Sequence, residues 1–400
     1  MVERIPDIGC IGLTGQMHGV LYTDQNNQAV SPLYTWQDGR GELIRRGQIS
    51  YSRYASEITG YKMASGYGIL THFNNIENRL VPDGVRYIVT IADYIAIKLT
   101  KAKSPLMHIS HAAALGAYDI LHEKIDENAL RKLEIDPAVV PEISGGYVKI
   151  GSYKGRSVFC AIGDNQASFL GSVQNPEKSI LINIGTGSQV SVYTNELIHC
   201  DSMELRPFMK KDYLLVGSSL CGGYAYSLLE MFYSRVLKMA GVSYTGSLMP
   251  HMDKAAEKAY KEGRNPLRVS TKFSGTRENP YIRGSIKNIG IDNFTPEELC
   301  LGTLRGIVEE LWEYYKAALP FIKGERTTLV GSGNSIKKSS LMTLLLSEAF
   351  KLPLFLTKHK EEASYGAALY ALIGEGVFED IKQAQSIIQY KKPDRIGGKP

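Results

Sequence analysis

Residues 179–193 read SILINIGTGSQVSVY, and this stretch decides the fold class. An apolar run ends at Gly185, and a second run, in which valine alternates with polar residues, begins directly after Gly187. Glycines that join two strands over so few residues form a tight turn, and such a turn can present Thr186 and nearby backbone N–H groups to a phosphate. We therefore expect a β-hairpin whose turn binds an anion; the alternative is an ordinary turn without a ligand.

A second glycine-rich turn lies in residues 327–346, TTLVGSGNSIKKSSLMTLLL. An apolar strand ends there at Gly331, Gly333 and Asn334, and a helical pattern opens near Ser335, which suits a nucleotide at a helix N-terminus. Neither turn carries the third glycine of a dinucleotide motif, and the chain contains no G-x-x-x-x-G-K-[ST]. The two turns together predict a phosphate hairpin and a separate adenosine loop, not a Rossmann or Walker site.

Working outward from these turns, short apolar runs alternate with stretches of helical periodicity, which predicts an α/β layered fold. We expect strands over residues 8–14, 158–162, 179–184, 213–216, 327–330 and 353–356, and helices over 224–239, 296–318, 337–350 and 361–373. Glycine, asparagine and proline in GSVQNPEK, residues 171–178, predict a domain boundary at that point. The charged, proline- and glycine-containing end, residues 389–400, is predicted to be a flexible tail.

Composition narrows the class of protein further. The chain has 400 residues, 44% of them hydrophobic and 22% charged, so it is neither a disordered tail nor a fibre. The net charge is only +5 and the basic residues are dispersed, which argues against nucleic acid and membrane surfaces as partners. No apolar run approaches the ~18 residues of a membrane span, and the start lacks the pattern of a secretory signal. Five cysteines without a C-x-x-C pair predict a reduced, cytoplasmic protein.

An aspartate is expected at the edge of the sheet where α/β proteins collect their ligands. In SVFCAIGDNQASFLGS, residues 157–172, a strand runs through Val158 to Ile162 and bends at Gly163, so Asp164 follows its carboxyl end. A carboxylate in that place can accept the proton of an attacking hydroxyl, which is worth roughly 10²–10⁴-fold in rate. It can equally cap the helix that follows, and this segment alone does not decide between the two roles.

Two short segments carry side chains typical of a polyol site. In CIGLTGQMHGVLY, residues 10–22, Gln16, Met17 and His18 lie at a bend between strands, and glutamine and histidine both donate and accept hydrogen bonds. Residues 34–42, YTWQDGRGE, add an apolar plate, an acceptor and a forked donor in Trp36, Asp38 and Arg40. The alternatives are a structural histidine and a solvated Asp38–Arg40 ion pair worth under about 1 kcal/mol.

The order of these segments along the chain resembles that of the FGGY carbohydrate kinases. Within that family the chain most resembles the sedoheptulokinase branch, with the xylulokinases as its neighbours, through GQMHGV, TWQDGR and SGYGILTHF. The resemblance extends over almost the whole chain. The segments that carry it are GLTGQMHGVLY, YTWQDGR, GDNQASFLGS, NIGTGSQVSV, FSGTRENPYIRGSIKNIG, LRGIVEELWEYY, LVGSGNSIKKSSLM and EEASYGAALYAL.

This resemblance implies a fold of two actin-like (ribonuclease H-like) ATPase domains with a cleft between them, here over residues 1–172 and 173–388. It implies ATP and Mg²⁺ as cofactors and Asp164 as the base that deprotonates the sugar hydroxyl. The positions that match sugar contacts in the family are Met17, His18, Trp36, Tyr67 and Asn165. Those that match the second phosphate loop are Gly185, Thr186 and Gly187, and those that match the adenosine loop are Gly331, Gly333 and Asn334.

The function expected from the resemblance is ATP-dependent phosphorylation of sedoheptulose to sedoheptulose 7-phosphate. D-xylulose, D-ribulose or another polyol are alternative substrates. Family members open with a D-x-G-T phosphate turn, whereas this chain starts almost directly at GQMHG, and residues 7–10 (DIGC) lie too close to Gln16 to form that turn. We therefore expect a first domain truncated at its N-terminus, and a non-catalytic sugar- or nucleotide-binding protein as the alternative from another class. No metal ligand is assigned, and a homodimer is compatible with the sequence.

Overall fold

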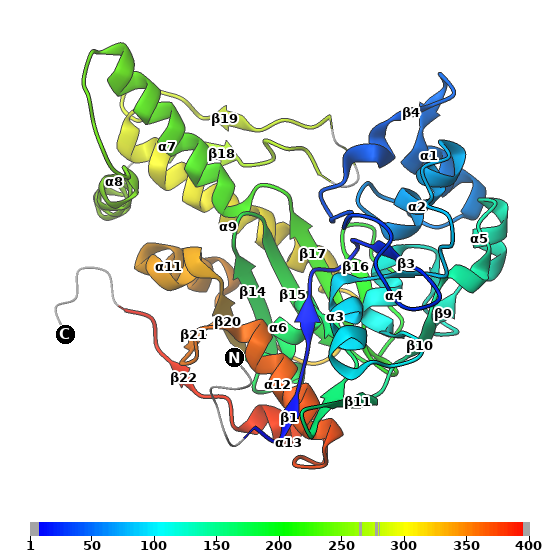
Figure 1. Cartoon of the computed structure of the whole chain (residues 1–400). Coiled ribbons are helices and arrows are strands. Elements are labelled where there is room, and N and C mark those ends of the chain that lie inside the picture. The colour runs from blue at the N-terminus through cyan, green and yellow to red at the C-terminus, as the bar shows by residue number, and fades with distance from the viewer. Residues whose placement is uncertain (1–7, 264–265, 277–278, 280, 395–400) are drawn as a thin grey trace.

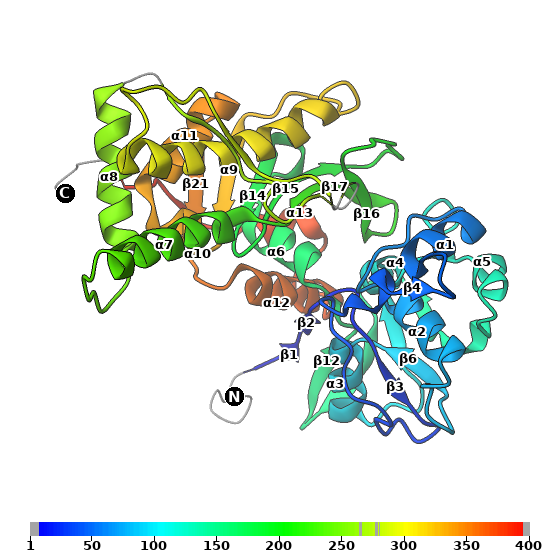
Figure 2. The same ribbon diagram turned by 90° about the horizontal axis from the view of Figure 1, so that it is seen from above.

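The computed structural model describes residues 8–263, 266–276, 279 and 281–394 (Figure 1). These residues form two lobes that are joined through a pair of packed helices (Figure 2). We call the elements from β1 to β13 the first lobe and those from β14 to β22 the second lobe. Across the described ranges, no helix is both long enough and apolar enough to cross a membrane.

The first lobe contains several small sheets packed with helices around one core. Its core is built from buried aliphatic and aromatic side chains such as Val20, Tyr22, Ile69, Phe73 and Leu130. Its helices are α1 (Tyr51–Thr59), α2 (Gly68–Glu77), α3 (Ile91–Thr100), α4 (Ile109–Leu115) and α5 (Glu127–Lys132). Its strands are β1 (Cys10–Ile11), β2 (Thr14–Gly15), β3 (Leu21–Thr23), β4 (Ile44–Arg45), β5 (Ile49–Ser50), β6 (Tyr87–Val89), β7 (Leu106–His108), β8 (Tyr118–Asp119), β9 (Lys124–Ile125), β10 (Glu142–Ser144), β11 (Lys149–Tyr153), β12 (Arg156–Phe159) and β13 (Ile162–Gly163).

The second lobe is organised around a seven-stranded sheet with the order β16-β17-β15-β14-β20-β21-β22. The three neighbours β14, β20 and β21 are parallel, and the other strand pairs are antiparallel. The strands are β14 (Ser179–Ile184), β15 (Ser188–Thr194), β16 (Glu204–Met209), β17 (Asp212–Ser219), β20 (Thr328–Ser332), β21 (Leu354–Thr357) and β22 (Tyr390–Lys391), with β18 (Arg268–Ser270) and β19 (Ser285–Lys287) forming a separate pair. The helices are α7 (Gly222–Met239), α8 (Met249–Glu262), α9 (Pro296–Ala318), α10 (Asn334–Lys338), α11 (Ser340–Phe350), α12 (Glu362–Gly374) and α13 (Ile381–Ser386).

Helix α6 (Asp164–Ser172) lies between the lobes, against α12 (Figure 2). Glycines allow the two backbones to touch: a Cβ at Gly171 would lie 2.1 Å from the Glu362 carbonyl oxygen, and one at Gly366 would lie 1.8 Å from that of Ala167. Around this contact a third core contains residues of both lobes, including Phe159 and Tyr370. The α6–α12 pair is therefore the packed connection between the lobes.

Most of the predicted elements are confirmed. The expected hairpin is β14 and β15, which pair antiparallel on either side of residues 185–187, and the helix predicted over 296–318 is α9. Three predictions differ in detail. The strand expected over 8–14 is two short strands, β1 and β2, which belong to different sheets. The helix expected over 337–350 is two helices, because Ser339 has extended backbone and caps α11 through its side chain. The flexible tail expected from residue 389 begins later, since Tyr390–Lys391 pair with β21 as strand β22; residues 395–400 lie outside the described ones.

Candidate active site

Two parallel strands bring the first candidate residues together. β2 pairs with β13 in the register Thr14 to Ile162 and Gly15 to Gly163. The next residue along each strand is Gln16 or Asp164, so these two residues follow the same edge of the sheet. Met17 lies against the same turn, because a Cβ at Gly163 would come within 3.0 Å of the Met17 Cγ and Sδ atoms.

Helix α4 supports the turn that carries Asp164 through a hydrogen bond. The Gly163 backbone N–H donates to the Ser110 Oγ at 2.9 Å, and that hydroxyl bonds the His108 Nδ1 at 2.8 Å. The Ser110 N–H also donates to the His108 Nδ1, so this nitrogen is an acceptor and His108 is the neutral Nε2–H tautomer. Its full burial lowers its pKa to about 3, which keeps the imidazole neutral.

Asp164 begins helix α6, and its own side chain is not the helix cap. The N-cap residue is Gly163, while the Asp164 Oδ1 accepts the neighbouring Asn165 N–H at 2.8 Å. Desolvation by the surrounding protein raises the Asp164 pKa, although that hydrogen bond and the nearby His111 and Arg206 act in the opposite direction. The residue is nevertheless exposed, so solvent still reaches it. A raised pKa makes an ionised carboxylate a stronger base.

Asn165 connects this turn to the second lobe. Its Nδ2 donates to the Gln189 Oε1 at 3.1 Å, and its Oδ1 accepts from the Arg206 Nη1 at 3.4 Å. Gln189 is the second residue of β15, directly after the glycine turn. The loop that carries Asp164 therefore lies beside the turn predicted to bind phosphate.

The two glycine-rich turns lie next to each other at one edge of the second sheet. β14 pairs in parallel with β20, so residues 185–187 and residues 333–334 follow neighbouring strand ends. Gly333 has a φ of +86°, and a Cβ there would lie 2.5 Å from the Ile184 carbonyl oxygen. The start of α7 lies against the first of these turns, because the Gly223 N–H donates to the Gly185 carbonyl at 2.9 Å. Thr186 and Asn334 are exposed at this junction, as a phosphate and a nucleoside contact would need.

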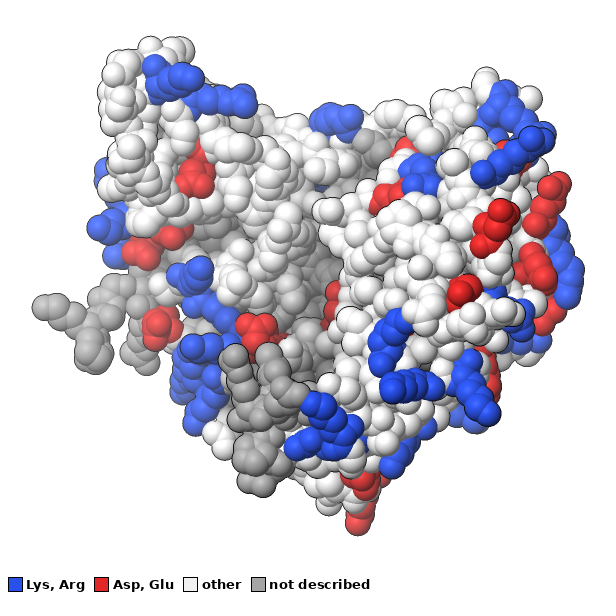
Figure 3. Space-filling model, viewed as in Figure 1, with Lys and Arg blue, Asp and Glu red and all other residues white. Residues whose placement is uncertain are grey.

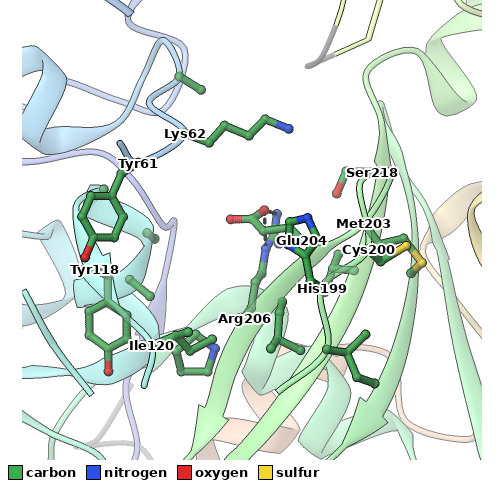
Figure 4. A pocket seen from close by; sticks show the side chains of 18 of the residues that line it. Tyr61, Lys62, Tyr118, Ile120, His199, Cys200, Met203, Glu204, Arg206 and Ser218 are labelled. Carbon is green, nitrogen blue, oxygen red and sulfur yellow. Dashed lines mark hydrogen bonds and ion pairs between the residues drawn. The ribbon is translucent and has the colours of Figure 1, made fainter. Parts of the chain in front are cut away.

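A pocket of about 610 Å³ opens between the lobes next to Asp164 (Figure 4). Tyr61 and Tyr118 belong to its first-lobe side, and Glu204 and Arg206 come from β16 on the facing side. Met17, Ser110 and Arg206 line it as well, and each contacts Gly163 or Asn165. The space-filling view is hollowed between the lobes, and charges of both signs are scattered over this face without a single-sign patch (Figure 3).

His18 and Tyr67 form one wall near this pocket. His18 has a φ of 72°, its ring stacks on that of Tyr67 with centroids 4.8 Å apart, and its Nδ1 donates to the Ala114 carbonyl at 2.7 Å. Tyr67 lines the pocket, and its hydroxyl donates to the Glu204 Oε1 at 3.4 Å. The structure therefore brings Gln16, Met17, His18, Tyr67, Asp164 and Asn165 into one region.

Trp36, Asp38 and Arg40 are not brought to the lining of this pocket. Asp38 caps a short 3-10 helix and pairs with the Arg40 Nε at 2.7 Å, and the Arg40 Nη1 turns away to the Asn75 Oδ1. The alternative of a solvated pair is wrong, because the Asp38 and Arg40 side chains are only 13% and 21% exposed. Trp36 is half-exposed. Their role in sugar binding stays a prediction.

Sequence reasoning missed the ion pair on β16. The Glu204 Oε2 accepts from the Arg206 Nε at 2.9 Å and from the Nη2 at 2.6 Å, and the Arg206 side chain is 5% exposed. A buried arginine two residues from a glutamate in MELRPF, residues 203–208, was a usable signal, because alternate residues of a strand share one face. The sequence around Ser110 contains no comparable signal of its contact with Gly163.

Comparison with known proteins identifies the first domain. Residues 4–168 match the N-terminal domain of the FGGY family of carbohydrate kinases. This part of the chain belongs to the FGGY family of carbohydrate kinases. It is 25% identical to mouse (Mus musculus) sedoheptulokinase over 92% of this chain and 82% of that protein.

Solved structures agree on the fold. A xylulose kinase from Lactobacillus acidophilus superposes with a TM-score of 0.80 at 18% identity, over 98% of this chain and 81% of that one. A Plasmodium falciparum glycerol kinase solved with ADP gives 0.76 at 20% identity, over 95% and 78%. The predicted α/β fold of two actin-like ATPase domains is thus confirmed, and this FGGY kinase is of the phosphotransferase class, whose members take a sugar and ATP as small-molecule substrates.

Proposed function

We propose that this FGGY kinase transfers the γ-phosphoryl group of ATP to a ketose, forming sedoheptulose 7-phosphate from sedoheptulose. The observation that carries the proposal is the Asn165–Gln189 hydrogen bond, which places Asp164 beside the turn over residues 185–187. Sequence similarity to a sedoheptulokinase supports this sugar, whereas the structural likeness to xylulose kinases supports D-xylulose or D-ribulose as the alternative.

In the proposed reaction Asp164 accepts the proton of the sugar hydroxyl. The hydroxyl oxygen then forms a bond to the γ-phosphorus while the bond from that phosphorus to the β–γ bridging oxygen breaks, and ADP leaves. Thr186, with the backbone of Gly185 and Gly187, would contact the phosphates, and residues Gly331, Gly333 and Asn334 would form the adenosine loop. Phosphoryl transfer depends mainly on positioning and on neutralised charge, so a water-excluding cleft between the lobes favours it.

The side chains of the site do not form a complete Mg²⁺ site by themselves, so Mg²⁺ would bind together with the nucleotide. Within the described ranges no three or more His, Cys, Asp or Glu side chains are grouped so that they could hold a metal ion. Mg²⁺ commonly binds one or two carboxylates and substrate phosphates, so the phosphates of ATP would supply most of its ligands, and we assign no protein ligand. When bound, the ion would neutralise charge on the transferred phosphoryl group.

The setting of the reaction is also proposed. We place the enzyme in the cytoplasm, because the five cysteines are free thiols and four of them are buried. We further propose domains over residues 1–172 and 173–388, supported by separate cores in the two lobes. A homodimer stays a prediction that light scattering would test.

A coupled assay for ADP with sedoheptulose, D-xylulose, D-ribulose and glycerol tests the proposal. We expect turnover that requires both ATP and Mg²⁺, with the highest kcat/KM for sedoheptulose. A higher kcat/KM for D-xylulose would replace the sugar but keep the reaction. No turnover with any of the four would remove the kinase function and leave the non-catalytic binding protein.

A further inference from the structure

A second cavity, of about 470 Å³, lies outside the active site, and we call it the distal cavity. It has no lining residue in common with the pocket beside Asp164. Its walls include Tyr193 near the end of β15 and Asp212 at the start of β17, whereas the turn over residues 185–187 precedes β15. At about 3.4 Å per strand residue, Tyr193 is about 20 Å from that turn. The volume of the cavity is typical of sites for small organic molecules.

Both lobes contribute side chains to the distal cavity. Tyr147, between β10 and β11, comes from the first lobe, and Tyr193, Phe208 and Ile381 come from the second. Phe208 is fully buried in the third core, which contains residues of both lobes, and the other three side chains pack against that core. The cavity therefore has an apolar and aromatic surface, and a molecule bound there would contact both lobes.

The charged side chains of the distal cavity are mostly acidic. Four carboxylates line it, those of Glu177, Asp212, Glu379 and Asp380, against the single ammonium of Lys382. Lys382 pairs with Glu177 at 3.4 Å. Over the part of the chain that the structure describes, the other three carboxylates form no ion pair. The described residues thus leave three negative charges of this cavity unpaired.

Asp212 and Asp380 are oriented by the protein and each keeps a free acceptor. The Asp212 Oδ1 accepts from the Tyr193 hydroxyl at 2.6 Å, and the Asp380 Oδ1 accepts from the Gln383 N–H at 2.8 Å. Within the described ranges no hydrogen bond reaches the Oδ2 atom of either carboxylate. Burial raises the pKa of Tyr147, and Asp212 and Asp380 raise it further, so both carboxylates are near its hydroxyl.

This combination of groups suits a cation with an apolar body. Carboxylates form charge-assisted hydrogen bonds with an ammonium group, and the faces of tyrosine rings attract cations. A metal ion fits less well, because the described residues hold no group of three or more His, Cys, Asp or Glu that could bind one.

We propose that the distal cavity is a binding site for a small organic cation. Its ammonium group binds the free oxygens of Asp212 and Asp380, and its apolar part packs against Tyr147, Tyr193 and Phe208. The site is separate from the sugar and nucleotide positions, and the proposal does not depend on the proposed kinase function.

Calorimetric titration of the full chain with benzylamine tests the proposal. Benzylamine carries an ammonium group at neutral pH and an aromatic ring, whereas benzyl alcohol has the ring without the charge and methylamine has the charge without the ring. We expect one benzylamine to bind per chain with a Kd of about 1 mM or lower, and each of the other two probes to bind at least about tenfold more weakly. Absence of saturable benzylamine binding, or equal affinity for benzylamine and benzyl alcohol, would overturn the proposal.

Asp212→Asn and Asp380→Asn locate the bound probe. Each variant removes one negative charge from the cavity, while the amide oxygen can still accept the hydrogen bond from Tyr193 or cap α13. We expect the Kd for benzylamine to rise at least about threefold in each variant, with little change for benzyl alcohol.

Asp83→Asn is the matched control, because Asp83 is exposed and does not line the distal cavity. It should leave the Kd for benzylamine within about twofold. An unchanged Kd in both Asp212→Asn and Asp380→Asn would place the probe elsewhere and overturn the proposal. The titrations contain neither ATP nor sugar, so their outcome is independent of whether the chain is active as a kinase.

Discussion

The residues predicted to bind the sugar fall into two groups that behave differently. Gln16 and Asp164 follow the ends of adjacent parallel strands and lie beside Met17, which lines the pocket between the lobes. Asp38 and Arg40 come from a loop with equally suitable side chains, yet they pair with each other and with Asn75. Strand register forces neighbouring ends together, whereas a loop can turn its polar groups into the protein. The following experiments test that difference, from the largest expected effect to the smallest.

Asp164→Asn should have the largest effect. The amide cannot accept the hydroxyl proton, so we expect turnover to fall about 10²–10⁴-fold, while sugar binding measured by calorimetry remains. The same variant should unfold at a higher temperature at neutral pH. The pKa of Asp164 is raised in the folded protein, so ionisation of this group destabilises the fold as pH rises through that pKa. Near-normal turnover in Asp164→Asn would exclude the base role.

The pH dependence of kcat/KM should report the ionisation of Asp164. Because desolvation raises the Asp164 pKa above its ordinary value of 3.8, kcat/KM should begin to fall at a pH above that value. Below the raised pKa it should fall about tenfold per pH unit, as the base becomes protonated. The value of kcat/KM for the sugar is measured with saturating ATP from about pH 4 to about pH 8. An acid limb at or below the ordinary aspartate value would contradict the raised pKa.

Arg206→Met should change both the free energy of unfolding and the pKa of Asp164. Removing the buried guanidinium takes two charge-assisted hydrogen bonds from the partly exposed Glu204, and we expect a loss of about 1–3 kcal/mol in urea unfolding. Arg206 also lowers the Asp164 pKa, so the acid limb should move to higher pH in this variant. Lys258→Met, which removes an exposed cation paired with Glu297, is the control and should change neither property. An unmoved acid limb would separate Arg206 from the base.

Asp38→Asn should have the smallest effect on turnover. Asn caps helices as well as Asp, but the bond to the Arg40 Nε weakens, so we expect a loss of about 1 kcal/mol in unfolding free energy. KM for the sugar should change less than about twofold. A tenfold rise in KM would instead place Asp38 among the sugar contacts and erase the difference between the two groups.

Much of the fold was predictable because its signals are local. Apolar runs ending in glycine located β14 and β20, the alternating run that follows Gly187 located β15, and periodicity located α9 to the residue. The edge position of Asp164 followed from the same reasoning, since a strand that ends in Gly-Asp before a helix leaves few other placements.

The contacts of Arg206 and Ser110 with the Asp164 turn were not predictable in that way. Both depend on which distant elements pack against the Asp164 turn: Ser110 is 53 residues from Gly163, and Arg206 is 41 residues from Asn165. Single-sequence patterns contain no information on such pairings. The direction of Arg40 was missed for the same reason, because Asn75 is 35 residues away.

The glycine contact between α6 and α12 has a mechanical consequence. We expect backbones that touch at Gly171 and Gly366 to rotate against each other more readily than they separate. Such a contact acts as a pivot, and points near a pivot travel less than points far from it. Asp164 is at the other end of the nine-residue α6, so a rocking of the lobes would carry the distant walls of the pocket farther than the base. Asp164 can thus keep nearly the same position while the cleft opens for sugar to enter and product to leave.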